Sequence, residues 1–204
     1  MNDINPTVIT EFDEASWASS GVNWARSLKT LMLPGVAVDY GIPPEGKDKL
    51  KELGLVCLPG QTELDNRAID RYASLLVGDL PSGVWLFCPP SHPLTTDTRN
   101  LFALAGSKLV CRTQPQQTFY MVFPVITIEN RVKVSTLIEE GVVKKYGDPL
   151  NASWLCGPTE QWETFIGFCK YCLGAGLVER RAVGLENLLL NLFAVSFEGT
   201  TEVI

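Results

Sequence analysis

Residues 84–94, VWLFCPPSHPL, begin with four consecutive apolar residues and continue into a segment with three prolines. A short apolar run of this kind is typical of a β-strand that is covered on both faces. Proline cannot donate a hydrogen bond to a neighbouring strand, so the strand must end at Cys88 or just before it. Ligand sites of open α/β sheets lie beyond the carboxyl ends of the strands, so we expect Cys88 and the two prolines after it beside such a site.

Three more apolar runs precede this strand, and a helical pattern follows each of them. The expected strands are 7–10, 36–40, 55–58 and 84–88, and the expected helices are 16–32, 43–54 and 62–76. Thr62 and Asp65 resemble a capping box at the start of the third helix. Short apolar strands that alternate with helices pair in parallel through right-handed crossovers. The sequence therefore predicts an α/β protein with a Rossmann-like, mostly parallel sheet flanked by helices.

The second half of the chain is less regular, and no repeat or linker separates it from the first half. We expect strands at 107–113, 119–129 and 153–157, and helices at 134–146, from 158 onward and at 185–197. The economical interpretation is a single domain over residues 1–204.

Composition narrows the class of protein. The chain has 204 residues, of which 46% are apolar and 20% charged, and its formal net charge is −6. An acidic chain lacks the basic face that a nucleic-acid partner requires. No apolar run approaches the 18 residues of a membrane span, and the first residues lack the pattern of a secretory signal. The six cysteines do not resemble a disulfide framework. Five of them lie inside or beside apolar runs and resemble small buried hydrophobic residues of a reducing compartment, so we expect a soluble cytoplasmic protein.

Most familiar site motifs are missing from the sequence. There is no G-x-G-x-x-G after the first strand and no G-x-x-x-x-G-K-[ST] loop. Cys169 and Cys172 have C-x-x-C spacing, but they lie deep in an expected helix without a second ligand pair, so core packing is the better interpretation. His92, the only histidine, is open to two interpretations, a general base or ligand and a polar loop residue.

Four polar residues stand out by their position. Asp13 follows the first strand and Asp39 ends the second, where α/β sheets commonly hold a ribose or a base. Asp13 is equally suited to cap the helix that follows it. Glu186 and Asn187 open the last apolar helix, where they need partners or line a cleft.

Five segments, in this order, resemble the GT-A-fold nucleotide-sugar glycosyltransferases of the glycogenin and bacterial lipopolysaccharide galactosyltransferase type. They are VITEFDEASWASSGVNWARSLKTL (8–31), VAVDYG (36–41), RYASLLVGDLPSGVWLF (71–87), LNASWLCGPTEQWETF (150–165) and GLENLLLNLF (184–193). The resemblance spans nearly the whole chain, and it consists of several short motifs in the family's order. It implies a nucleotide-binding half over 1–110 and an acceptor and sugar half over 111–204.

The resemblance also implies roles for single residues. It assigns Glu186 as the catalytic carboxylate, nearest the transferred sugar. The residues it assigns to the donor are Thr10, Asp13, Asp39, Arg71, Asn151, Gly157 and Asn187. Thr10 and Asp13 would face the base and the ribose, whereas Asn151 and Gly157 would line the sugar pocket. The implied co-substrate is a nucleotide-sugar, with UDP-sugars favoured, and no tightly bound cofactor is implied.

One segment departs from the family. The apolar strand of the family ends in Asp-x-Asp, whose carboxylates hold a divalent metal, but here Cys88, Pro89 and Pro90 follow the strand. Mg²⁺ and Mn²⁺ prefer oxygen ligands, and these three side chains offer no carboxylate. We therefore expect no metal site there. Two hypotheses remain: a glycosyltransferase without an Asp-x-Asp metal site, or a non-catalytic relative that binds a nucleotide-sugar or another protein. The acceptor and the oligomeric state stay open.

Overall fold

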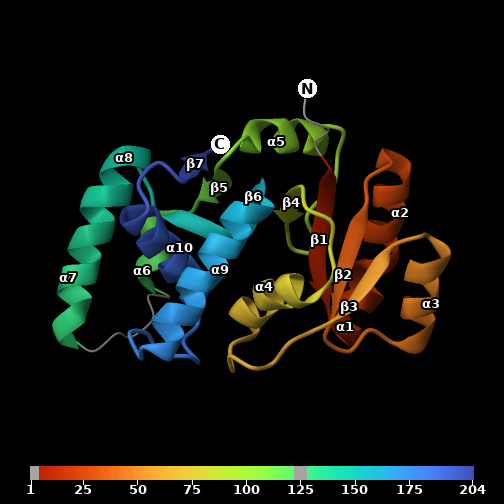
Figure 1. The fold of residues 1–204 in the computed structure, drawn as a ribbon, viewed down its shortest axis with the longest axis horizontal. Coiled ribbons are helices and arrows are strands. Elements are labelled where there is room, and N and C mark those ends of the chain that lie inside the picture. The colour runs from red at the N-terminus through yellow and green to blue at the C-terminus, as the bar shows by residue number, and fades with distance from the viewer. Residues whose placement is uncertain (1–4, 122–127) are drawn as a thin grey trace.

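A seven-stranded sheet forms the centre of the protein (Figure 1). The structure is a computed structural model that describes residues 5–121 and 128–204. Its strand order is β3-β2-β1-β4-β6-β5-β7. The strands are β1 (Pro6–Phe12), β2 (Gly35–Asp39), β3 (Val56–Pro59), β4 (Val84–Phe87), β5 (Leu109–Thr113), β6 (Leu150–Pro158) and β7 (Thr201–Val203).

The first half of the sheet is parallel, as the sequence predicts. β1 pairs in parallel with β2 on one side and with β4 on the other, and β2 pairs in parallel with β3. In this register Val8 lies between Gly35 and Leu86. β6 is antiparallel to both β4 and β5, and β7 is parallel to β5. The expected α/β fold with a mostly parallel sheet is therefore confirmed.

Helices cover both faces of the sheet. They are α1 (Glu14–Ser16), α2 (Val22–Leu31), α3 (Pro44–Glu52), α4 (Arg67–Val77), α5 (Thr98–Ala105), α6 (Gln116–Met121), α7 (Ile128–Ile138), α8 (Lys144–Tyr146), α9 (Thr159–Gly174) and α10 (Leu185–Ser196). Short π-helical segments, Trp17–Gly21 and Glu139–Val143, join α1 to α2 and α7 to α8.

Strand alternation sends neighbouring side chains to opposite faces and so builds two cores. Ile9 and Phe87 pack with α4, α9 and α10 in one buried cluster, whereas Val8 and Leu86 pack with α2, α3 and α5 in the other. Burial of these large apolar surfaces is the main force that holds the helices on the sheet. Cys169 and Cys172 lie in the first cluster, which agrees with their interpretation as core residues.

Two expectations about single elements are wrong. α4 begins at Arg67, because Asn66 caps it: the Asn66 side chain accepts a hydrogen bond from the Ile69 backbone N–H at 3.2 Å. The capping box at Thr62 therefore does not form. The strand expected at 119–129 is also wrong at its ends, which belong to α6 and α7, and its centre, 122–127, lies outside the described residues. The expectations missed α5 and β7 as well.

All six cysteines are free thiols. Within residues 5–121 and 128–204, no helix has both the length and the apolar character needed to cross a membrane.

Candidate functional site

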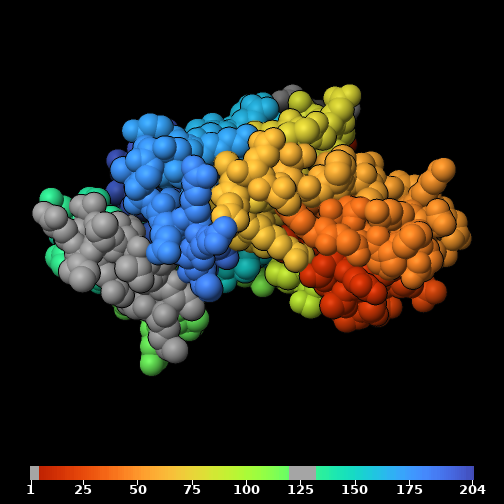
Figure 2. All heavy atoms as spheres, turned by 90° about the horizontal axis from the view of Figure 1, so that it is seen from below, coloured from red at the N-terminus to blue at the C-terminus, as the bar shows by residue number. Residues whose placement is uncertain are grey.

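The carboxyl ends of β1, β2 and β4 meet at one edge of the sheet, at the lower end of these strands in Figure 1. Figure 2 looks onto the molecule from this side, with α1 in red and the segments around α3 and α4 in orange and yellow. The start of α4, the end of β4 and the start of α10 belong to the same region. Arg71 of α4 contacts Glu11 and the Phe87 ring, and the charge of Glu186 raises the pKa of Arg71. This edge is where an open α/β sheet holds its ligand.

The end of β4 is tied to β1 by two hydrogen bonds. The Cys88 backbone N–H donates to the carbonyl oxygen of Ile9 at 3.1 Å, and the Thr10 hydroxyl donates to the carbonyl oxygen of Cys88 at 2.8 Å. Both Thr10 and Cys88 are fully buried, and burial raises the pKa of the Cys88 thiol to about 12. The Thr10 side chain therefore positions the loop after β4 and is itself covered from any ligand.

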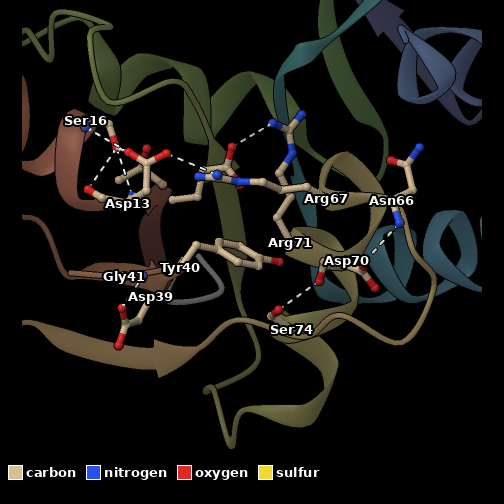
Figure 3. Close-up of polar contacts among 12 residues, drawn as sticks. Asp13, Ser16, Asp39, Tyr40, Gly41, Asn66, Arg67, Asp70, Arg71 and Ser74 are labelled. Atoms are coloured by element: carbon tan, nitrogen blue, oxygen red, sulfur yellow. Dashed lines mark hydrogen bonds and ion pairs between the residues drawn. The ribbon is translucent and has the colours of Figure 1, made fainter. Parts of the chain in front are cut away.

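Two arginines of α4 project toward this edge. Arg67 and Arg71 are one helical turn apart and so lie on the same face of the helix. Arg67 extends toward Asp13, where its Nη1 lies 3.1 Å from Asp13 Oδ2 (Figure 3). Its guanidinium also stacks over the Tyr40 ring at 4.8 Å. Both arginines contact the Glu11 carboxylate, each at 3.5 Å.

Arg71 is a buried cation, since its side chain is only 12% exposed. Its Nη2 donates to the Tyr72 hydroxyl at 3.0 Å, and its guanidinium lies 4.6 Å from the centre of the Phe87 ring. Burial alone would lower the pKa of Arg71, but Tyr72, Glu11 and Glu186 raise it above its ordinary value. The Arg71 Nε is buried and has no hydrogen-bond partner among the described residues. The edge thus holds a fixed positive charge with one donor free.

The two acidic residues at the strand ends have different surroundings. Asp13 caps α1, because its side chain accepts a hydrogen bond from the Ser16 backbone N–H at 2.8 Å, and it also pairs with Arg67. Asp39 accepts hydrogen bonds from the N–H groups of Gly41 and Ile42, and its Oδ2 lies 2.6 Å from Lys47 Nζ. In Figure 3 the Asp39 carboxylate is turned away from the two arginines. Asp13 therefore belongs to the arginine cluster and Asp39 does not.

Glu186 is half-buried in the first turn of α10, which follows Gly184 in the left-handed conformation. Its charge raises the pKa of both Arg71 and Tyr72, so Glu186 lies within electrostatic reach of the arginine cluster. The Asn187 side chain instead accepts a hydrogen bond from the Ala152 backbone N–H at 2.7 Å. The Asn191 side chain exchanges two hydrogen bonds with the Leu150 backbone. These two amides fasten α10 to β6.

The remaining donor residues lie on β6, at opposite ends of the strand. Asn151 lies at the end that pairs with Arg112 and Thr113, which is the carboxyl end of β5. Gly157 pairs with Trp85 near the start of β4, far along the strand from this edge. A Cβ atom at position 157 would lie 2.5 Å from Leu109 Cδ2, so the glycine permits close packing against β5.

No protein-family model and no curated protein matches the chain. Solved structures match it over nearly its whole length. The galactosyltransferase LgtC, in complex with donor and acceptor sugar analogues, is 15% identical with a TM-score of 0.58, and the match covers 97% of this chain and 72% of LgtC. The 4-diphosphocytidyl-2C-methyl-D-erythritol synthase from Anaerococcus prevotii is 11% identical with a TM-score of 0.57, and the match covers 98% of this chain and 88% of the synthase. The chain has a GT-A-like fold.

A third match extends the set. It is the glucosyl-3-phosphoglycerate synthase from Mycobacterium tuberculosis, solved with Mn²⁺, UDP and glucosyl-3-phosphoglycerate. This synthase is 12% identical with a TM-score of 0.50, and the match covers 95% of this chain and 80% of the synthase. The resemblance drawn from the sequence is therefore confirmed at the level of the GT-A-like fold.

The chemistry of the residues after β4 does not suit the metal that the GT-A family implies. Cys88 is buried and its raised pKa keeps the thiol neutral, and prolines have no side-chain oxygen. Among the described residues, no group of three or more His, Cys, Asp or Glu side chains is placed to hold a metal ion. His92 lies in the loop that follows, 6.4 Å from the Trp154 ring, and burial and the nearby Arg112 lower its pKa.

The sequence expectations missed Glu11 and Arg67 as members of the cluster in this GT-A-like fold. The spacing of Arg67 and Arg71 was the available signal, because residues four apart share a helix face. Glu11 gave no comparable signal. It becomes a partner of both arginines only through the packing of α4 beside β1, which the sequence does not reveal.

Proposed function

We propose that the carboxyl edge of β1, β2 and β4 binds a nucleotide-sugar donor, and that Arg67 and Arg71 face its diphosphate. The observation that carries this proposal is the buried, charged Arg71 with a free Nε at the end of β4. Guanidinium groups bind phosphate oxygens through several parallel hydrogen bonds. Support also comes from the GT-A-like fold and from the UDP in one of its structural matches.

The other residues of the edge complete the proposed donor site. Asp13, 38% exposed, would contact the ribose or base beside Arg67. Asn151 would contact the sugar from the near end of β6, and Glu186 would lie closest to the transferred sugar. We leave Thr10 and Gly157 out of direct contact, because both are packed inside the sheet, and we leave Asn187 out because it bonds to β6.

Sugar transfer at such a site requires charge stabilisation without the family's metal. The bond between the anomeric carbon and the phosphate oxygen would break, the acceptor oxygen would bond to that carbon, and its proton would pass to a base. The leaving nucleoside diphosphate gains negative charge, which Arg71 and Arg67 would stabilise, while the Glu186 carboxylate would stabilise the positive charge on the sugar.

A non-catalytic donor-binding protein is the second candidate function. It is favoured by the segment Cys88 to Pro90, a neutral thiol and two prolines at the position that the sequence resemblance assigns to the metal-binding carboxylates. A protein of this kind would bind the donor through the same two arginines and release it unchanged. In either case the free, mostly buried thiols suit a reducing, cytoplasmic setting.

Calorimetric titration with UDP and with UDP-sugars, each with and without Mn²⁺, tests both candidates. We expect binding with less than about a tenfold dependence on Mn²⁺, which corresponds to about 1.4 kcal/mol. Metal-independent hydrolysis or transfer of the bound sugar supports the enzyme, and binding without turnover supports the second candidate. Absence of binding to every nucleotide would reject both.

Arg67→Gln provides the matched test of the site, because Arg67 is about half exposed and its loss should leave the fold intact. We expect UDP affinity to fall about tenfold, with an unchanged melting temperature within about 2 °C. Arg26→Gln, on the exposed surface of α2, is the control and should bind UDP as the wild type does.

A further inference from the structure

A carboxylate of the protein itself lies between the two arginines. Glu11 Oε1 is 3.5 Å from Arg71 Nη1, and Glu11 Oε2 is 3.5 Å from Arg67 Nε. The carboxylate thus bridges the pair, with one oxygen for each guanidinium. A phosphate group that used both arginines would present two oxygens in the same way.

The bridge is close but poorly bonded. Charge-assisted N–H···O hydrogen bonds are usually 2.7–2.9 Å long, and both contacts exceed that range. Glu11 Oε2 is buried and accepts no hydrogen bond from the described residues. Arg71 Nε is also buried, and it donates no hydrogen bond to them. The Glu11 side chain is 18% exposed, so water compensates these groups only in part. An acceptor and a donor are therefore both left unsatisfied in one cluster, which costs stability.

Charge in the region is unfavourable for a dianionic ligand as the cluster stands. Glu11, Asp13 and Glu186 carry three negative charges against the two positive charges of Arg67 and Arg71. A diphosphate that approached the arginines would meet the Glu11 carboxylate at the point where its own oxygens must bind. Either the carboxylate moves away from the guanidinium groups or the diphosphate binds less tightly.

We propose that Glu11 holds the anion position between Arg67 and Arg71 in the free protein, and that the phosphate oxygens of a bound donor displace its carboxylate. This inference rests on the proposed function, because it assumes that the same arginines bind the donor. The ligand it predicts is an anion with at least two oxygens on adjacent phosphates, a diphosphate. Glu11 is then a residue that lowers affinity for the donor, and its carboxylate pairs with both guanidinium groups while the site is empty.

Glu11→Gln tests the inference, since it removes the charge and keeps the size of the side chain. The probes are UDP and inorganic pyrophosphate, titrated by calorimetry. We expect both to bind about tenfold more tightly to the variant, although the variant should melt at a lower temperature because Arg71 loses a counter-charge. Glu163→Gln, on the exposed side of α9, removes the same charge elsewhere and should leave both affinities unchanged.

A purely structural role for Glu11 predicts the opposite result. If Glu11 only orients the arginines, its loss should weaken binding, and weaker or equal binding to Glu11→Gln overturns the inference while leaving the proposed function in place. Failure of UDP and pyrophosphate to bind either the wild type or the variant rejects both proposals. Should Glu11→Gln not fold, Glu11→Asp keeps the charge but shortens the reach by one methylene. It should then also bind pyrophosphate more tightly, and equal or weaker binding by that variant overturns the inference.

Discussion

The Thr10 hydroxyl donates a hydrogen bond to the carbonyl oxygen of Cys88 at 2.8 Å, and both residues are fully buried. This bond sets the position at which the loop after β4 leaves the sheet. Two prolines, Pro89 and Pro90, follow Cys88 directly and restrict the backbone further, so the floor of the candidate site is rigid at this point. A residue assigned to the donor by resemblance thus acts through the loop.

Thr10→Val tests this role, because valine matches the shape of threonine and lacks the hydroxyl. The Cys88 carbonyl would remain buried without its partner, and we expect a loss of about 2 kcal/mol in the free energy of unfolding, measured with urea. Thr164→Val, exposed on α9, should change stability by less than about 0.5 kcal/mol. A loss that small at position 10 would contradict the structural role.

The hydrogen bonds from Ser16 and the pairing with Arg67 lower the pKa of Asp13 from 3.8 to about 2. A carboxyl whose pKa is lower in the folded protein stabilises the fold above pH 3.8, and this contribution is lost as the pH falls toward 2. Because Asp13 is partly exposed, we expect Asp13→Ala to cost only about 1 kcal/mol at pH 7. Urea unfolding should show the difference from wild type shrinking between pH 4 and pH 2. A difference that stays constant over that range would contradict the lowered pKa.

Glu186→Gln separates a catalytic from a capping role. If Glu186 stabilises the reacting sugar, the variant should bind UDP normally and turn over at least about a hundredfold more slowly, as measured by sugar release from the donor. If Glu186 only favours the first turn of α10, unfolding should become easier by about 0.5–1 kcal/mol and turnover should persist. Turnover at the wild-type rate would remove Glu186 from the site.

Asn191→Leu examines how α10 is fastened to β6. Asn191 is fully buried, and its side chain exchanges hydrogen bonds of 2.9 and 3.0 Å with the Leu150 backbone. Leucine is similar in size but leaves both backbone groups unpaired, so we expect a loss of about 3 kcal/mol in urea unfolding. Asn100→Leu on the exposed surface of α5 should be nearly neutral. Equal stabilities of the two variants would show that the Leu150 backbone finds other partners.

The strands of the first half were predictable because each is a short apolar run between turn residues, and the alternation with helices fixed their parallel pairing. The start of α4 was misplaced because Thr62 and Asn66 are both acceptable caps by type, and only the fold shows that the Asn66 side chain bonds to the helix. The expected strand at 119–129 failed at its ends because an apolar run does not by itself distinguish a strand from a buried helix.

The candidate site was predictable only in outline. Asp13 and Glu186 were identified from their positions and from the resemblance, and Arg71 from the resemblance alone. Asp13 pairs with Arg67, Arg67 and Arg71 share Glu11, and the charge of Glu186 raises the pKa of Arg71. Thr10 and Gly157 were identified by the same route, but side-chain direction and strand position place one in the core and the other far along β6. Such details depend on packing between segments that are distant in the sequence.

The position of β6 has a consequence for how the chain reaches this structure during synthesis. β6 lies between β4 and β5, although it follows both in the sequence, and it pairs with each of them. A nascent chain that ends before residue 150 therefore carries an unpaired hydrophobic edge at β4, with Trp85 and Phe87 uncovered by α9. Pairings between such distant segments form slowly, and exposed strand edges invite association with other chains. Ribosome-bound or truncated chains of this length should depend on chaperones until β6 emerges.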